Sequence, residues 1–355
     1  MIKSKLLAST MLVSAAALVA AGSANAAPLK LGGYAEFWAG YAGNDKSVGN
    51  VNDLDVKSDI EIYFSKKWTL DNGIKMGVKL EMEAGSGNDS GSGTTGPGGF
   101  DESSMYMQTT YGKFNIGNND VASAYVGGVS VIGPIGITKS DVGDWLPNSY
   151  KELNNSDVDL GMGDAQNITY FTPKVGGLQG IVSYTPDSSD KDAHDYDKQE
   201  TTGFHNGLSG ALKYSAKMGG TSVSLGAGYT TVENTDVAGA KSESSGYGMT
   251  GKISFSGLKL SATHAHENNA SDTDSYWAVA ALYKTGKNAV SIGYVEGEED
   301  TGSAKNESQL VTVGFERNLG SGVKWSSSIA SAEDKQSGST KVDGIAIVSG
   351  FKMKF

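Results

Sequence analysis

IKMGVKLEME, residues 74–83, shows the pattern that recurs along most of the chain. Its even-numbered positions carry Ile, Met, Val, Leu and Met, whereas its odd-numbered positions carry Lys, Gly, Lys, Glu and Glu. Alternation with a period of two is typical of a β-strand with one apolar and one polar face. The same alternation occurs at residues 60–64, 223–229, 290–294, 311–315, 323–329 and 345–355. The sequence therefore predicts an all-β protein.

The connections between these strands are of two kinds, and the two kinds take turns along the chain. Seven are short turns rich in glycine, which supplies the positive φ that tight hairpins need. They lie at residues 71–73, 111–113, 175–177, 218–220, 256–257, 285–287 and 320–322. Eight are long polar loops, at about 44–56, 85–101, 119–165, 187–204, 233–243, 268–274, 298–306 and 334–340. Fifteen connections join sixteen strands, and a short-turn rim opposite a long-loop rim is the layout of antiparallel transmembrane β-barrels.

The amino terminus predicts export. Two lysines precede an apolar run at residues 6–21, and the run is followed by Ala24-Asn25-Ala26, a cleavage pattern of secretory signal peptides. We expect residues 1–26 to be removed and residues 27–355 to form one barrel domain. A membrane-anchor helix is the alternative, but the apolar run is short, rich in alanine and interrupted by serine and threonine.

The composition excludes several classes of protein. The absence of Cys excludes a disulfide scaffold and cysteine-ligated metals. The formal net charge of −11, which becomes about −13 once the two leader lysines are lost, argues against nucleic acid as a partner. No stretch after the leader is apolar enough for a spanning helix, so a membrane location requires a closed barrel. A soluble β-sandwich or β-helix is the alternative, although neither needs short and long connections to alternate.

If the apolar rows face lipid, the opposite rows face the inside of the barrel. These rows carry many charged and polar side chains, which the early strands supply at the positions of the predicted pore wall. These are Glu36, Glu61, Tyr63, Lys79, Glu81 and Tyr106, and later strands add Lys213, Lys252, Lys259, Lys284, Lys324, Lys352 and Lys354. Burying so many charges without partners is strongly unfavourable. We therefore expect a water-filled lumen, which a barrel of about sixteen strands is wide enough to hold.

The third long loop, residues 119–165, is much longer than typical connections, and long loops are often functional. It contains seven acidic residues and two lysines. It also contains the apolar run YVGGVSVIGPIGI, residues 125–137. Because such a run is unfavourable in an exposed loop, we expect it to fold back onto another part of the molecule.

Three segments resemble the trimeric general porins of Gram-negative bacteria: MYMQTTYGKFNIGNND at 105–120, NITYFTPKVGGLQGIVSYTP at 167–186, and the last strand ending in Phe355. The resemblance covers the whole mature chain. It implies a homotrimer that is exported through the periplasm to the cell outer membrane, in contact with outer-membrane lipid and lipopolysaccharide. It also implies passive diffusion of ions and small hydrophilic solutes, and a terminal Phe355 that the outer-membrane assembly machinery reads.

The same resemblance implies that the third long loop folds into the barrel and narrows the pore. Its acidic residues, among them Asp120, Asp141 and Asp144, would then face a basic cluster on the wall. The sequence departs from this pattern, because the wall cluster is usually rich in arginine and the only arginine here is Arg317. Lys79 is accompanied instead by glutamates. We therefore expect a weak preference for cations, with no catalytic residues and no cofactor.

Two other functions stay open at this point. A substrate-selective channel, for a sugar or another small solute, would use aromatic side chains, and Trp38, Tyr63 and Tyr106 are candidates. An outer-membrane hydrolase would need a Ser–His pair with an orienting third group. His264 and His266 lie on one predicted strand with the parity of lipid-facing residues, and an interfacial role for them is the simpler interpretation.

Weak calcium binding is a further possibility for the acidic loops. Five aspartates lie between residues 187 and 197, and carboxylate oxygens suit Ca²⁺. Their spacing does not match an EF-hand, so a solvated acidic loop is the simpler interpretation.

Overall fold

The computed structural model describes residues 28–44, 53–84, 100–137, 142–146, 158–188, 203–235, 239–338 and 341–355. The predicted signal peptide lies outside these ranges. The described strands are β1 Lys30–Asn44, β2 Leu54–Thr69, β3 Lys75–Glu83, β4 Phe100–Thr109, β5 Gly112–Asn118, β6 Gln166–Phe171, β7 Leu178–Asp187, β8 Gly203–Met218, β9 Thr221–Thr235, β10 Lys241–Phe255, β11 Leu258–Asn268, β12 Thr273–Thr285, β13 Asn288–Asp300, β14 Lys305–Gly320, β15 Val323–Lys335 and β16 Val342–Lys354.

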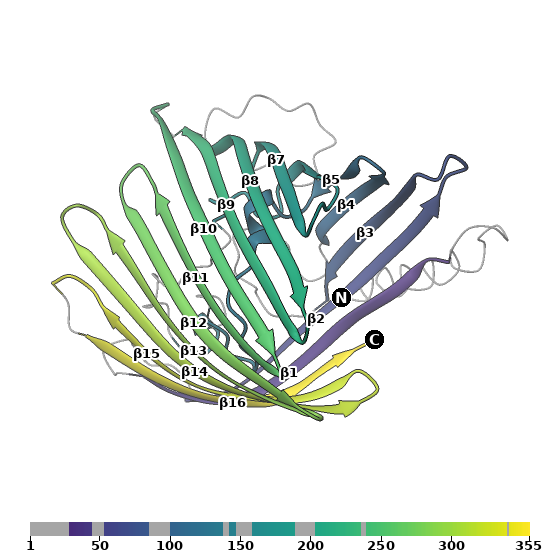
Figure 1. Cartoon of the computed structure of the whole chain (residues 1–355). Helices are drawn as coiled ribbons and strands as arrows, with labels where there is room; N and C mark the ends of the chain where they lie inside the picture. Colours follow the sequence, from purple (N-terminus) through teal and green to yellow (C-terminus); the bar gives the residue numbers. More distant parts are fainter. Residues whose placement is uncertain are drawn as a thin grey trace, which may run out of the picture.

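The sixteen strands form one closed antiparallel barrel, which confirms the fold class expected from the sequence (Figure 1). Each strand pairs with its neighbours in the chain, and β1 also pairs with β16. At this seam Tyr34 lies opposite Lys354. The Gly33 N–H donates to the Phe355 carbonyl at 3.0 Å, and the Phe355 N–H donates back at 3.2 Å. The last residue thus completes the ring of strands.

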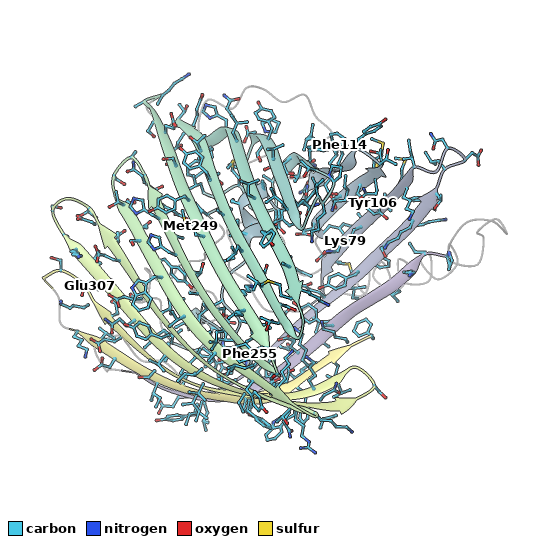
Figure 2. The ribbon with its side chains drawn as sticks, viewed as in Figure 1. Lys79, Tyr106, Phe114, Met249, Phe255 and Glu307 are labelled. Atoms are coloured by element: carbon cyan, nitrogen blue, oxygen red, sulfur yellow. The ribbon has the colours of Figure 1, made fainter. Side chains whose placement is uncertain are left out.

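The turns and loops fall where the sequence predicts them. The seven short turns lie between β2 and β3, β4 and β5, and so on to β14 and β15, so they share one rim of the barrel. The long connections share the other rim, where Glu307 lies, whereas Phe255 lies at a short-turn end (Figure 2). The third long loop runs from residue 119 to residue 165, because β5 ends at Asn118 and β6 begins at Gln166.

Successive residues of each strand differ sharply in exposure. On β13, Val290 and Ile292 are 48% and 53% exposed, whereas Ala289, which precedes Val290, and Ser291, which lies between the two, are buried. A continuous band of exposed apolar side chains on a closed barrel is a surface for lipid. We call these positions the apolar row and those on the other face of the sheet the opposite row. No helix among the described residues is long and apolar enough to cross a membrane.

The main hydrophobic core joins the opposite row to the third long loop. From the loop it takes Val121, Ile135, Trp145 and Leu146, each less than 10% exposed. From the strands it takes mainly small or branched residues: Ala265, Ala278, Val295, Leu310, Ala330, Ala332, Ala346 and Val348. The apolar run of the loop therefore has a packed site, as the sequence analysis expects.

Circular dichroism of the folded protein in detergent should show a β-rich spectrum with very little helix. The expectation follows from sixteen strands and, among the described residues, only short helical turns such as Ala122–Val126. A spectrum dominated by helix would contradict the fold. Heating in detergent provides the control, since loss of the β signal shows that it came from folded protein.

Candidate functional site

The third long loop is fixed to the strands by side-chain hydroxyls. The Ala122 N–H donates to Ser183 Oγ of β7 at 2.8 Å, and the Ser123 N–H donates to Ser209 Oγ of β8 at 2.9 Å. Thr230 of β9 donates to Ser123 Oγ at 2.9 Å. These bonds satisfy the first turn of the loop, whose short 3₁₀ helix at Ala122–Val126 is largely buried. A buried backbone N–H without a partner is strongly unfavourable, so serine and threonine in the opposite row have a structural use.

The next part of the loop repeats this arrangement on later strands. The N–H groups of Ser130, Ile132 and Ile135 donate to three serines at 2.9, 3.0 and 3.2 Å. The serines lie on β11, β13 and β15: Ser261, Ser291 and Ser328. Thr312 of β14 donates back to the Ile135 carbonyl at 2.9 Å. The loop backbone is thus held at intervals from β7 to β15.

Glycines allow the loop to approach the strands closely. A Cβ placed on Gly314 would lie 1.7 Å from the Ile132 carbonyl oxygen, and one on Gly293 would lie 2.6 Å from a Val131 methyl. On β1, a Cβ on Gly40 would lie 2.4 Å from the Trp145 ring. Any side chain at Gly314 would therefore require the loop backbone to move. From the sequence, glycine is expected in the short turns, whereas these glycines lie within strands where the loop approaches closely.

The predicted wall residue Glu36 is paired rather than free. Its carboxylate forms an ion pair with Lys352 of β16 and accepts a hydrogen bond from the Trp38 indole N–H at 3.1 Å. The Lys352 ammonium also lies 4.3 Å from the centre of the Tyr34 ring. Glu36 therefore contributes little net charge to its surroundings.

Glu61 lies in a cluster of tyrosines and acids on β1 and β2. The Tyr34 hydroxyl lies 2.6 Å from the Glu61 carboxylate and 2.7 Å from that of Asp59. The Tyr63 hydroxyl donates to Glu61 as well. The two rings contact each other edge to face, with centroids 6.3 Å apart. Glu61 and Tyr63, both named from the sequence as wall residues, thus share one cluster with Tyr34 and Asp59, which the sequence did not single out.

Lys79 and Glu81 of β3 form an ion pair, and Lys79 also lies 3.6 Å from Glu102 of β4. Asp120 of the third long loop lies close enough for Glu102, Asp159 and Lys79 to affect it electrostatically. Burial raises the pKa of the Asp120 carboxyl above its usual range, and the charges of Glu102 and Asp159 raise it further, while Lys79 opposes them. Asp120 is therefore where the loop meets the charged wall.

The other predicted site residues lie in different settings. Tyr106 faces Gly77 on the neighbouring strand, close to Lys79 (Figure 2). Asp144 is exposed, and Asp141 lies outside the described residues. Trp38 packs against the loop core. Because Trp38 is partly covered by that core, it is poorly placed to continue an aromatic track with Tyr63 and Tyr106.

Two groups of carboxylates could hold a cation. The oxygen atoms of Asp59, Glu61 and Glu83 lie within 4.8 Å of one another, as do those of Glu102, Asp120 and Asp164. Hard oxygen ligands suit Ca²⁺. The five aspartates at 187–197, on which the sequence-based expectation rests, fall largely outside the described residues. Weak calcium binding stays a prediction.

A group of lysines lies on the same face of the sheet as these acids, but on later strands. Lys113 of β5, Lys213 of β8 and Lys252 of β10 all come from the opposite row, near the short-turn ends of their strands. The sequence analysis named Lys213 and Lys252 as lumenal but did not expect them to cluster. The signal that could have revealed the cluster is that Lys213 and Lys252 lie only five and three positions before the last residues of β8 and β10, close to the short turns.

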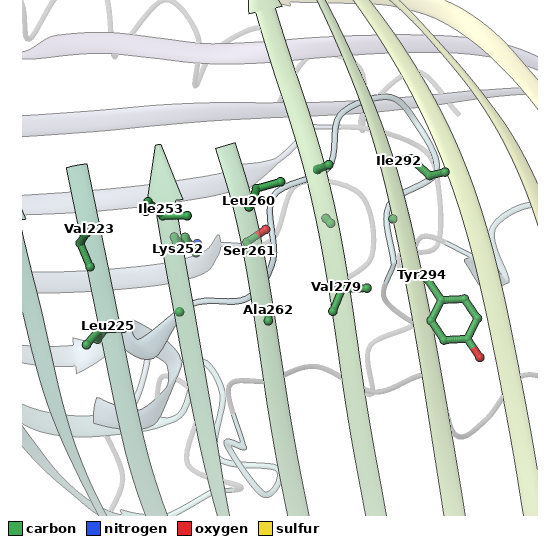
Figure 3. Close-up of a pocket in the computed structure, with 14 residues that line it drawn as sticks. Val223, Leu225, Lys252, Ile253, Leu260, Ser261, Ala262, Val279, Ile292 and Tyr294 are labelled. Carbon is green, nitrogen blue, oxygen red and sulfur yellow. The ribbon is translucent and has the colours of Figure 1, made fainter. Parts of the chain in front are cut away.

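The apolar row carries features that are separate from these charges. A shallow hollow of about 670 Å³ lies over β9–β13, and its lining includes the small residues Gly251, Ala262 and Ala281. Larger apolar side chains such as Leu225, Leu260 and Ile292 also line it (Figure 3). Further along the same row, His264 Nε2 lies 3.5 Å from the Tyr247 hydroxyl, and the rings of Tyr247 and His266 are 5.6 Å apart. The nearest polar contact of the His264 ring is thus with a tyrosine, not with the serine that a hydrolase would require.

A closed barrel of antiparallel strands, with an exposed apolar row and a charged opposite row, defines the class of outer-membrane β-barrels. Residues 8–337 match the sequence model of the Gram-negative porin family. The chain therefore belongs to the Gram-negative porins, which are outer-membrane proteins with transmembrane β-strands that serve transport. A search of curated proteins finds no significant match.

Solved structures of similar fold include three porins or outer-membrane proteins. The anion-selective porin from Comamonas acidovorans has a TM-score of 0.62 and 17% identity, covering 92% of this chain and 99% of its own. The trimer form of OmpT from Vibrio cholerae has a TM-score of 0.63 and 14% identity, covering 93% and 100%. A mutant of Rh. blastica porin has a TM-score of 0.55 and 15% identity, covering 92% and 100%. At these identities the likeness is one of fold alone.

Proposed function

We propose that the chain forms a water-filled channel for passive diffusion of ions and small hydrophilic solutes across the outer membrane, without enzymatic chemistry or a cofactor. The observation that carries the proposal is the opposite row, which presents acids on β1–β4 and lysines on β5–β10 inside a closed barrel. Burying charged side chains away from water is strongly unfavourable, so charges that line an enclosed space favour a lumen filled with water. Planar-bilayer recording should show stepwise conductance, and a folded protein that gives no steps would refute the proposal.

We further propose that the third long loop narrows this lumen. The apolar row faces lipid, so the opposite row faces the interior, and the hydroxyls that hold the loop all belong to the opposite row. The loop is fixed along β7–β15, and its Asp120 lies beside Lys79 and Glu102 of β3 and β4. The open path would then run between the loop and the wall of β2–β5, because Trp145 of the loop packs against Gly40 of β1.

We propose a homotrimer as the assembly, with one pore per subunit. Support comes from the fold shared with Vibrio cholerae OmpT, whose structure is described as a trimer form. Conductance steps that appear and close in groups of three would accord with this assembly. Steps that are always single would contradict it.

We also propose a modest preference of the pore for cations. Asp120, Glu102 and Asp159 place several negative charges where the loop meets the wall. At physiological salt, charges act over about 8 Å, so those lining a narrow passage affect a passing ion. The pairing of Glu36 with Lys352 and of Glu81 with Lys79 keeps the preference small.

The reversal potential in a potassium chloride gradient should therefore indicate cation preference at low salt, and Asp120→Asn should weaken it. The pKa of Asp120 is raised above the ordinary aspartate value of about 3.9. As the pH falls, Asp120 should therefore lose its negative charge at a higher pH than an ordinary aspartate does. The cation preference of the unmodified protein should decline as this charge is lost, and the variant should lack this step.

Asp343→Asn is a matched control for Asp120→Asn, because Asp343 is exposed in the apolar row at the long-loop end of β16. It should leave the reversal potential unchanged. Anion preference of the unmodified protein at low salt would overturn the proposal, and would mean that the lumenal lysines dominate.

We propose that Phe355 is an assembly signal for outer-membrane insertion. Its backbone closes the seam with Gly33, and its ring is 62% exposed and thus accessible. Deleting Phe355 should lower the amount of folded protein in the outer membrane severalfold, whereas Phe355→Tyr should preserve it. Equal yields of the deletion variant and the unmodified protein would contradict this role.

A further inference from the structure

Three lysines of the opposite row, Lys213, Lys252 and Lys259, form a group of like charges on one side of the proposed lumen, and Lys174 of the β6–β7 turn adds a fourth. Lys252 lies close enough to Lys213 and Lys259 for their charges to repel one another, and Lys213 is in turn affected by Lys174. Within the described ranges, none of the four forms an ion pair with a carboxylate. This differs from Lys79, Lys324 and Lys352, which are all paired.

Serines surround these lysines because of the register of β8 to β11. Directly paired positions place lysine and serine side by side in two successive rows across the sheet. The first row is Lys217, Ser222, Ser254 and Lys259, and the second is Ser215, Ser224, Lys252 and Ser261. Most of these residues line a hollow of about 420 Å³. Ammonium and hydroxyl groups are both hydrogen-bond donors, and no carboxylate lines the hollow.

A second hollow of about 440 Å³ lies beside the first. It is lined by Lys113, Lys174 and Lys213, together with the side-chain amides of Gln108 and Gln179 and with Tyr125 of the third long loop. Lys213 links the two hollows, because it lines this one and repels Lys252 of the other. The donors therefore form one continuous surface.

This surface lies directly against the third long loop, on its short-turn side. A Cβ placed on Gly127 would lie 3.7 Å from Lys252 Nζ, and the Ser130 N–H is bonded to Ser261 Oγ. Lys252 is three residues from the end of β10 at Phe255. A solute that has passed the loop from the long-loop side would meet these lysines next.

We propose that Lys213, Lys252 and Lys259, with the serines between them, form a binding site in the pore for a phosphate-like dianion. Such an anion has two negative charges and several oxygen atoms that accept hydrogen bonds. The site offers ammonium groups that repel one another, together with many hydroxyl donors. Hydrogen bonds between ionised partners are the strongest, so a dianion suits this site. Chloride offers one charge and no oxygen. The lysines of this site lie on the short-turn side of the third long loop, whereas the acids around Asp120 lie where the loop meets β3 and β4. An anion site near the short turns is therefore compatible with the proposed cation preference at the loop. The inference rests on the proposed channel function.

The test is planar-bilayer recording of the full-length mature protein in potassium chloride at pH 7.5, with inorganic phosphate added at constant ionic strength. Phosphate should reduce the single-channel current, and more strongly when added on the short-turn side. Lys213→Gln combined with Lys252→Gln should raise the phosphate concentration needed for half-block at least tenfold. Lys324→Gln should leave it unchanged, because Lys324 is a lumenal lysine near a short turn that is already paired with Glu316 at 2.9 Å.

The outcomes separate the site from the channel. The first outcome against the site concerns the unmodified protein. If added phosphate lowers its current no more than added chloride does at the same ionic strength, the proposed anion site is wrong, while the proposed channel still stands. Equal half-block concentrations for the double variant and the unmodified protein would also overturn the anion site. A protein that inserts but never conducts would refute the channel itself. If the double variant fails to fold, the same comparison is made with Lys252→Gln alone.

Discussion

Deleting residues 121–137 should raise the single-channel conductance severalfold. This segment carries the serine- and threonine-bonded part of the third long loop, from Val121 to Ile137, and its removal would free the space beside β7–β15. The wall itself should persist, because all the strand pairs that close the barrel are independent of the loop. Conductance of the unmodified protein and of the variant would be compared in the same salt.

The deletion should also lower thermal stability. Val295 and Leu310 are almost fully buried and share a cluster with Ile135 and Ile137, so the deletion would expose them to water and each would lose free energy of apolar burial. A deletion of similar kind at residues 301–304, in the β13–β14 loop, is the control and should change neither quantity much. If conductance is unchanged in a folded 121–137 deletion, this loop is not the constriction.

The architecture of the barrel could be predicted because its signals are local. In a strand with one lipid-facing row, apolar residues recur at every second position, as in residues 74–83. A short turn is indicated by its glycine residues. Both signals are visible without knowing which strand pairs with which. The limits of the third long loop were predicted correctly for the same reason, since the strands on either side of it are regular.

The position at which that loop packs against the strands could not be predicted, because the contacts that hold it join residues far apart in the chain. The bond from Ser130 to Ser261 spans 131 positions, and that from Ile135 to Ser328 spans 193. In the sequence, Ser261 and Ser328 look like ordinary polar residues of an inward-facing row. Only the closed barrel shows that they bond to backbone N–H groups.

Barrel closure also explains why the pairing of the wall charges could not be predicted. Glu36 lies in the first strand and Lys352 in the last, and they meet only because β1 pairs with β16. Counted along the sequence, Glu36 adds a negative charge to the wall, whereas in the structure it is paired. The clustering of Lys213, Lys252 and Lys259 was missed for a related reason, because it depends on the register of four strands.

Replacing Gly314 by valine should also increase conductance severalfold, without removing any part of the loop. A Cβ at this position would lie 1.7 Å from the Ile132 carbonyl oxygen, so the loop backbone must move away and lose the bond from Ile132 to Ser291. Valine is favoured in strands, so β14 itself should keep its pairing. The variant should conduct more than the unmodified protein, with larger current fluctuations, and a protease should cleave its loop faster.

Gly210→Val is the matched control for Gly314→Val. Gly210 is also a strand glycine, on β8, but a Cβ there would have no atom within 4 Å. It should therefore leave conductance and loop cleavage unchanged, while sharing any general effect of placing valine on a strand. If Gly314→Val folds and conducts like the unmodified protein, the loop can detach from β14 without widening the pore, and the constriction must be formed by the part of the loop beside β7–β9.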